Sequence, residues 1–140
     1  MPSPITQLLA PQGPVVAAIR ARFPNAMAVY AFGSRVQGTA GSESDLDLAV
    51  LVVGYADPLA LWDVAGGLAD MVGCPVDLLD LRAASTVMQY QVITTGQCLW
   101  SGGLPAGLFE TFVLSEKTAF DEARAPLTAD IQHTGKIHGR

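Results

Sequence analysis

The segment from Gly33 to Val50 constrains the fold of this chain more than any other. It begins with the small pair Gly33-Ser34, continues through a loop rich in glycine and serine, and ends in Asp45-Leu46-Asp47-Leu48. Consecutive side chains of an extended strand point to opposite faces, so the two carboxylates share one face and the two leucines share the other. We therefore predict a strand that packs its leucines on a core and carries a site on its carboxylate face.

The residue types in this segment indicate a site for a metal-bound nucleoside triphosphate. Two carboxylates at neighbouring positions of one face repel each other unless a cation lies between them. Mg²⁺ fits there because it takes a few carboxylate oxygens and shares its other positions with water and substrate phosphates. Small residues upstream let backbone N–H groups approach a phosphate closely. Asp-x-Asp alone is common in turns without a metal, so this interpretation depends on the small pair Gly33-Ser34 as well.

Gly33-Ser34, ten intervening residues and then Asp45-x-Asp47 resemble the GSx10DxD signature of DNA polymerase β-like nucleotidyltransferases. The short length is similar to that of the minimal nucleotidyltransferase (MNT) antitoxins of HEPN/MNT toxin–antitoxin pairs. The resemblance implies an α/β (α+β) nucleotidyltransferase fold, in which a mixed central sheet is flanked by helices, mainly on one side. It also implies a third catalytic carboxylate on the strand that follows the Asp-x-Asp strand.

Two residues are candidates for that third carboxylate, Asp77 and Asp80. They are three positions apart, so they face opposite sides of a regular strand and only one can meet Asp45 and Asp47. Asp77 matches the family's pattern, and Asp80 is then expected to be solvated or to cap the strand end. We assign Asp45, Asp47 and Asp77 as catalytic residues and metal ligands.

The resemblance implies nucleotide-binding roles for Gly33, Ser34, Arg35 and Ser44. The Ser34 hydroxyl and nearby backbone amides would grip the β- and γ-phosphates of ATP, and Arg35 would add charge near the leaving pyrophosphate or be a solvated surface residue. Ser44 would orient a metal ligand. Two Mg²⁺ ions about 3.5–4 Å apart can hold the attacking and leaving oxygens, with Asp77 as an alternative acceptor of the proton.

Hydrophobic periodicity predicts a single domain over residues 1–140, with a core of about 14–101 and a C-terminal helical segment of about 105–134. Helices are predicted over 15–23, 34–37, 57–72 and 84–95 and from 105, and strands over 26–32, 45–53, 76–81 and 96–100. Within the helix predicted over 57–72, Gly66-Gly67 weakens the helical pattern, and a close packing contact would explain these small residues. The last helix has apolar anchors (Leu108, Phe109, Phe112, Phe120) and acidic residues that could meet a basic partner (Glu110, Glu116, Asp121, Glu122).

Composition and charge exclude several classes of protein. Half of the 140 residues are hydrophobic, which excludes a disordered chain, and no apolar run reaches the length of a membrane span. The N-terminal residues do not form a secretory signal, so we expect a cytoplasmic location in which Cys74 and Cys98 are reduced. With a net charge of −5, the chain is unsuited to binding long nucleic acid and better suited to a basic protein partner.

These observations predict an Mg²⁺-dependent nucleotidyltransferase that moves AMP from ATP onto a hydroxyl. The resemblance implies that the hydroxyl belongs to a tyrosine of a cognate HEPN ribonuclease toxin, which is neutralised as a result. One alternative is an enzyme that acts on a small molecule or an RNA end. Another is a non-catalytic antitoxin that neutralises its toxin by binding alone. A hetero-oligomer with the toxin is expected, and the sequence leaves the oligomeric state and the base specificity open.

Overall fold

The structure is a computed structural model that describes residues 7–33 and 45–118. Along the chain lie α2 (Pro14–Arg22), β1 (Ala26–Phe32), β2 (Leu46–Val52), α4 (Pro58–Val72), β3 (Val76–Asp80), α5 (Thr86–Thr95) and β4 (Gln97–Ser101). A further helical segment over 104–118 follows, which we call helix 104–118. The predicted helices and strands agree with these elements to within about two residues, and the helix predicted over 34–37 lies outside the described residues.

The strands form one mixed four-stranded sheet in the order β3-β2-β1-β4. β1 pairs antiparallel with both β2 and β4, whereas β2 and β3 run parallel and are joined through α4. The N-terminal ends of β2 and β3 therefore lie at the same end of the sheet as the C-terminal end of β1. Asp45, Asp47 and Asp77 lie at this end of the sheet.

Local sequence explains where the helices begin and end. Pro14 and Pro58 occupy the first turns of α2 and α4, where a missing N–H costs nothing. Asp57 caps α4 by accepting a hydrogen bond from the Leu59 N–H (3.3 Å), and Ser85 caps α5 through the Met88 N–H (3.1 Å). Gly73 ends α4 in a left-handed conformation.

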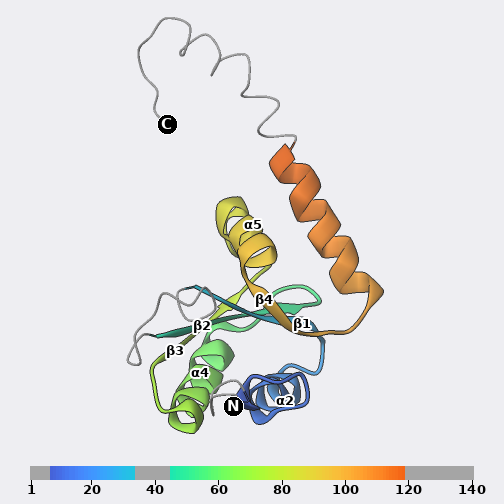
Figure 1. Cartoon of the computed structure of the whole chain (residues 1–140). Coiled ribbons are helices and arrows are strands. Elements are labelled where there is room, and N and C mark those ends of the chain that lie inside the picture. Colours follow the sequence, from blue (N-terminus) through green and yellow to red (C-terminus); the bar gives the residue numbers. More distant parts are fainter. Residues whose placement is uncertain (1–6, 34–44, 119–140) are drawn as a thin grey trace, which may run out of the picture.

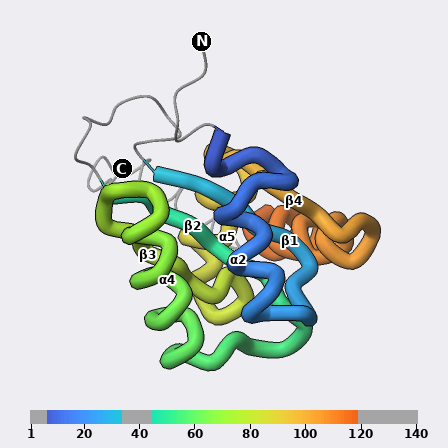
Figure 2. The backbone as a smooth tube through the Cα atoms, turned by 90° about the horizontal axis from the view of Figure 1, so that it is seen from below, coloured from blue at the N-terminus to red at the C-terminus, as the bar shows by residue number. Residues whose placement is uncertain are grey.

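Helices cover both faces of the sheet (Figure 1). α2 and α4 lie side by side on one face, as Figure 2 shows from below, and α5 and helix 104–118 cover the other. Each face has its own core cluster, one around Leu46, Leu48 and Val50 and the other around Ala49 and Leu51. The expectation that helices pack mainly on one side is therefore wrong, because β2 alternates two sets of apolar side chains that both need cover.

Helix 104–118 is attached to the sheet by Ala106, Phe109 and Val113, which are buried in the second core cluster. Beside them, the Tyr30 hydroxyl of β1 donates a hydrogen bond to Oε2 of Glu110 (2.6 Å). Glu110 thus faces the sheet and does not belong to an acidic outer face, contrary to the sequence-based expectation. Burial and the hydrogen bond to Glu110 both raise the pKa of Tyr30 well above its ordinary value.

Two further predictions about the helices are wrong. Phe112 and Leu108 are 58 % and 59 % exposed, so they do not anchor helix 104–118 to the sheet. Gly66 and Gly67 make no close packing contact, because a Cβ atom at either position would meet no described atom within 4 Å.

Within the described ranges, no helix is both long and apolar enough to cross a membrane. Asp121, Glu122 and Phe120 lie beyond those ranges.

The Tyr30–Glu110 hydrogen bond predicts a pH-dependent difference in stability. Tyr30→Phe leaves the Glu110 carboxylate without this donor, so we expect its free energy of unfolding at pH 8 to be lower by about 1–2 kcal/mol. Above pH 10 the unfolded chain loses the Tyr30 proton while the folded chain keeps it, so the wild-type advantage falls by about 1.4 kcal/mol per pH unit. Urea unfolding at pH 8 and pH 11 measures both effects. Tyr55→Phe, at a 71 % exposed position, is the control; a pH-independent difference between wild type and Tyr30→Phe would contradict the prediction.

Candidate active site

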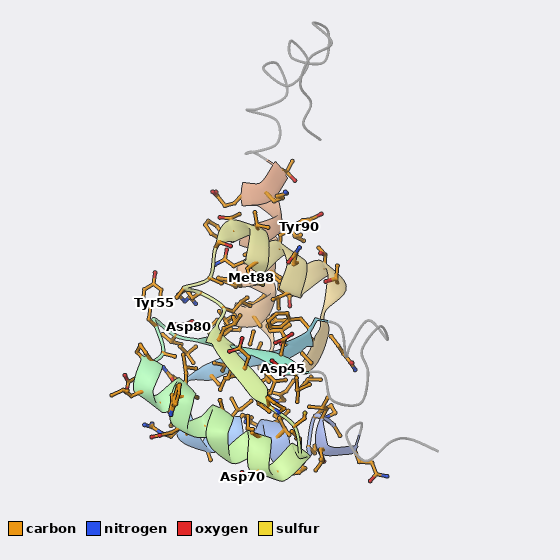
Figure 3. All side chains as sticks on the ribbon, turned by 90° about the vertical axis from the view of Figure 1, so that its left-hand side faces the viewer. Asp45, Tyr55, Asp70, Asp80, Met88 and Tyr90 are labelled. Atoms are coloured by element: carbon orange, nitrogen blue, oxygen red, sulfur yellow. The ribbon has the colours of Figure 1, made fainter. Side chains whose placement is uncertain are left out.

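Asp47 lies at the centre of a row of three residues that crosses the sheet. Phe32 of β1 pairs with Asp47, and Asp47 pairs with Asp77 of β3 in the parallel ladder. Directly paired residues on strands about 4.8 Å apart point to the same face, so the carboxylates of Asp47 and Asp77 lie side by side. Asp45 is exposed one residue before β2, and Figure 3 places it between α4 and α5. The structure thus places Asp47 and Asp77 side by side, with Asp45 at the same end of the sheet and near enough to affect the charge of Asp47.

The electrostatics of Asp47 reflect this crowding. Its pKa is raised by partial burial and, in decreasing order, by the negative charges of Asp77 and Asp45. Partial burial and nearby negative charges both disfavour the ionised form of a carboxyl group, whereas a bound cation favours it. The row is therefore an electrostatically strained site that a cation would relieve.

Gly33 supplies the turn next to this row. Its φ of 86° lies in the left-handed region, where residues with a side chain are strained. A Cβ atom there would collide with Oδ2 of Asp47, so the backbone of the turn lies directly against that carboxylate. Glycine at position 33 is thus required both by its own conformation and by the position of Asp47.

Asp80 differs from Asp77 in the face of the sheet that it occupies and in its hydrogen bonds. It pairs with Val50, faces the α2–α4 side of the sheet and is only 8 % exposed. Its Oδ2 accepts a hydrogen bond from the Ala56 N–H (2.8 Å) and its Oδ1 accepts one from the Arg82 N–H (3.0 Å). The strand-parity prediction is therefore confirmed: Asp80 caps the end of β3, is buried rather than solvated, and lies away from the other acids.

The chemistry of the donor set fits a hard divalent cation. Asp45, Asp47 and Asp77 offer only carboxylate oxygens, and the Gly33 turn leaves room against Asp47 that any side chain would fill. No three Asp, Glu, His or Cys side chains in residues 7–33 and 45–118 are gathered closely enough to hold a metal ion by themselves. Mg²⁺ does not need such a cage, because it commonly binds through one or two carboxylates and the phosphates of a substrate.

Three residues predicted to bind nucleotide, Ser34, Arg35 and Ser44, lie outside the described residues. Sequence reasoning missed Phe32, which stands directly across from Asp47 on the same face of the sheet. It also missed Arg82, which donates hydrogen bonds to the Val52 carbonyl and lies over the Phe109 ring, 5.1 Å from its centre. The alternation of β1 could have placed Phe32 beside the acids, whereas no local signal identifies the partners of Arg82.

The two roles of the β3 acids predict opposite effects on stability. Asp80→Ala leaves the N–H groups of Ala56 and Arg82 without their acceptor in a buried position, so we expect a loss of about 3 kcal/mol. Asp77→Ala removes a charge that repels Asp47, so we expect the free energy of unfolding to stay the same or to rise. Urea unfolding of the two variants tests this ranking, and equal losses would contradict it.

The contact between Gly33 and Asp47 predicts a specific loss of cation binding. Gly33→Ala forces Asp47 to move and should weaken binding of Mn²⁺, measured by calorimetry, by about tenfold or more. Gly54→Ala is a matched control: its φ of 79° imposes similar backbone strain, but a Cβ atom there meets no described atom within 4 Å. If both variants bind Mn²⁺ as the wild type does, Gly33 does not shape the site.

Comparisons with known proteins agree with this geometry. The polymerase beta nucleotidyltransferase family model matches residues 16–102, which span every strand of the sheet. Protein adenylyltransferase MntA from Shewanella oneidensis is 36 % identical over 117 residues, which cover 84 % of each chain.

Solved structures give the same result. The crystal structure of a toxin–antitoxin with AMP-PNP contains a chain that is 36 % identical, with a TM-score of 0.73 over 84 % of this chain and 95 % of that one. The structure of a tri-AMPylated Shewanella oneidensis HEPN toxin in complex with an MNT antitoxin contains a chain that is 32 % identical. Its TM-score is 0.67, over 84 % of this chain and 92 % of that one. Because the family model spans the whole sheet and a relative is 36 % identical over most of the chain, the chain belongs to the polymerase β-like nucleotidyltransferase family.

Proposed function

We propose that this chain is a protein adenylyltransferase that moves AMP from ATP onto a tyrosine of a cognate HEPN-domain toxin and so acts as the antitoxin. The observation that carries the proposal is the pairing of Asp47 with Asp77 beside the Gly33 turn, at the end of the sheet where Asp45 also lies. The 36 % identity to a protein adenylyltransferase supports the transferred group, and the likeness to an MNT antitoxin bound to a tri-AMPylated HEPN toxin supports the acceptor.

In this proposal the chain's own residues bind and orient the reactants. Asp45, Asp47 and Asp77 would hold Mg²⁺, which would supply positive charge to the triphosphate and to the acceptor hydroxyl. The family resemblance assigns the β- and γ-phosphates to the Gly33 turn and Ser34, the charge of the departing pyrophosphate to Arg35, and the orientation of a metal ligand to Ser44. The tyrosine oxygen would attack the α-phosphorus, the bond between that phosphorus and the oxygen of the β-phosphate would break, and pyrophosphate would leave. Asp77 would take the tyrosine proton in the alternative in which it acts as the base and not as a metal ligand.

The proposal extends to the chain as a whole. We expect residues 1–140 to act as one domain, because helix 104–118 packs on the same sheet that carries the acids. We also expect the chain to act in the cytoplasm. The toxin's tyrosine would approach the sheet face that bears Asp47 and Asp77, which is the face shared with α5 and helix 104–118. Phe32 lies on that face beside Asp47, and its apolar side chain would help to exclude water from the reacting groups.

Intact-mass analysis tests this function directly. The purified chain is incubated with the cognate HEPN protein, Mg²⁺ and each nucleoside triphosphate in turn. We expect a mass gain of one or more AMP units on the HEPN protein with ATP, located on tyrosine, and none after EDTA is added. Asp45→Asn/Asp47→Asn should lower the transfer by orders of magnitude, whereas Asp57→Asn, at an exposed cap position of α4 that asparagine also fills, should transfer normally.

Other outcomes separate the alternatives. If the Asp45→Asn/Asp47→Asn variant protects cells from the toxin as well as the wild type does, neutralisation is by binding and the adenylyltransferase proposal is wrong. If AMP appears on an RNA end or a small alcohol and not on the HEPN protein, the chain is a nucleotidyltransferase with a different acceptor.

A further inference from the structure

The outer face of α4 carries large apolar side chains that nothing in the described part of the chain covers. The inner face of this helix is buried through Ala60 and Leu68, each 1 % exposed. On the outer face, Leu59 and Trp62 are 75 % and 78 % exposed and are three residues apart, so they are neighbours on the helix surface. A tryptophan exposed to this extent is unusual in a chain that has two covered sheet faces, and exposed apolar patches mark interaction sites.

The glycine pair continues the same outer surface toward the end of α4. Gly66 and Gly67 are exposed, and a Cβ atom at either position would meet no described atom within 4 Å. Glycine is the least favourable helix residue after proline, and no packing inside the described structure requires it here. The missing side chains leave a flat stretch of backbone that a second helix can approach closely, next to the Leu59–Trp62 pair.

Charge decides which kind of partner fits. α4 contains Asp63 and Asp70, both exposed, and no Lys or Arg. Figure 3 shows Asp70 on the outer side of α4. Two copies of α4 that crossed symmetrically at the glycine pair would place Asp63 of one copy near Asp70 of the other, where like charges repel. A helix with basic residues on both sides of an apolar stripe would instead pair with both aspartates.

α4 is also well placed relative to the reaction. It packs beneath β3, the edge strand that carries Asp77, and only residues 73–75 separate the two elements along the chain. A protein held on the outer face of α4 can therefore pass around the free edge of β3 to reach the sheet face that bears the carboxylates. Binding energy collected on α4 would position the acceptor without crowding the charged site.

We propose that the outer face of α4, formed by Leu59, Trp62, Asp63, Gly66, Gly67 and Asp70, docks a basic amphipathic helix of the acceptor protein. The inference rests on the proposed function for the existence of a protein acceptor. Leu59 and Trp62 supply the apolar anchor, the glycine pair sets the close approach of the two helices, and the aspartates fix the orientation of the partner.

Binding of the full-length chain to the cognate HEPN protein, measured without nucleotide, tests the proposal. We expect Leu59→Ser/Trp62→Ser to raise the Kd by at least about tenfold. The control Val53→Ser, at an exposed apolar position just after β2 and at the end of the sheet away from the acids, should leave the Kd within about twofold of wild type. Asp63→Asn/Asp70→Asn should slow association and reduce its dependence on salt.

A second variant separates docking from folding. Gly66→Ala/Gly67→Ala should raise the Tm, by about 4 °C or more, because alanine favours the helix and meets open space. The same variant should weaken the complex, because the added methyl groups hold the partner helix away. A purely structural role for the glycines predicts the opposite change in Tm.

The failures of the two proposals are distinguishable when AMP transfer is measured in parallel. Three outcomes would overturn the docking proposal. The Kd of Leu59→Ser/Trp62→Ser could equal that of the wild type, or the wild-type chain could fail to bind. The free chain could also self-associate in a way that this variant abolishes. Transfer of AMP by a variant that binds normally leaves the proposed function standing without the docking face. A complex that depends on α4 but in which no AMP is transferred supports the docking face and contradicts the proposed function.

Discussion

Burial of Leu46, Leu48 and Val50 is the constraint on which the arrangement of this sheet depends, because it keeps Asp47 and Asp77 side by side against their repulsion. Parallel pairing of β2 and β3 places the two carboxylates side by side, and Asp45 adds a third negative charge nearby. Like charges directly opposite each other destabilise a pair of strands. The sheet keeps this register because the other face of β2 buries Leu46, Leu48 and Val50 completely. A shift by one residue would turn those side chains toward the other core cluster and the carboxylates toward this one, so hydrophobic burial holds the acids together.

The opposite end of β3 shows why an aspartate only three residues away has no part in the site. Asp80 faces the α2–α4 core and is saturated by the backbone N–H groups of Ala56 and Arg82. Arg82 then reaches back to the Val52 carbonyl, and Gln89 donates to the carbonyls of Leu81 and Arg82. This corner fixes where β2 and β3 end, which fixes the register at their beginning. Buried hydrogen bonds at one end thus support an unsatisfied cluster of charge at the other.

The sequence predicted the strands well, because they depend on local alternation and on turns, whereas a third acid on the strand after Asp45-x-Asp47 was implied by the family resemblance. Parity separated Asp77 from Asp80, and that separation holds in the structure because β3 is regular throughout. The helix faces were harder. In helix 104–118, two apolar stripes compete for the core, one through Ala106, Phe109 and Val113 and the other through Leu104, Leu108 and Phe112. Spacing identifies both stripes, but only the position of Tyr30 opposite Glu110 decides which one faces the sheet.

Apolar side chains therefore remain in water on two helices, even though both sheet faces are covered. Complete burial of one large apolar side chain stabilises a complex by about 1.5–3 kcal/mol, and Leu59, Trp62 and Phe112 are each more than half exposed. A site made of carboxylates offers little of this energy to a protein substrate, because it attracts cations and repels other acids. An enzyme of this kind must collect its binding energy away from the reacting atoms and use it to place one hydroxyl within reach of the nucleotide. The exposed apolar side chains of α4 fit that division, because they lie apart from the carboxylates on which the reaction depends.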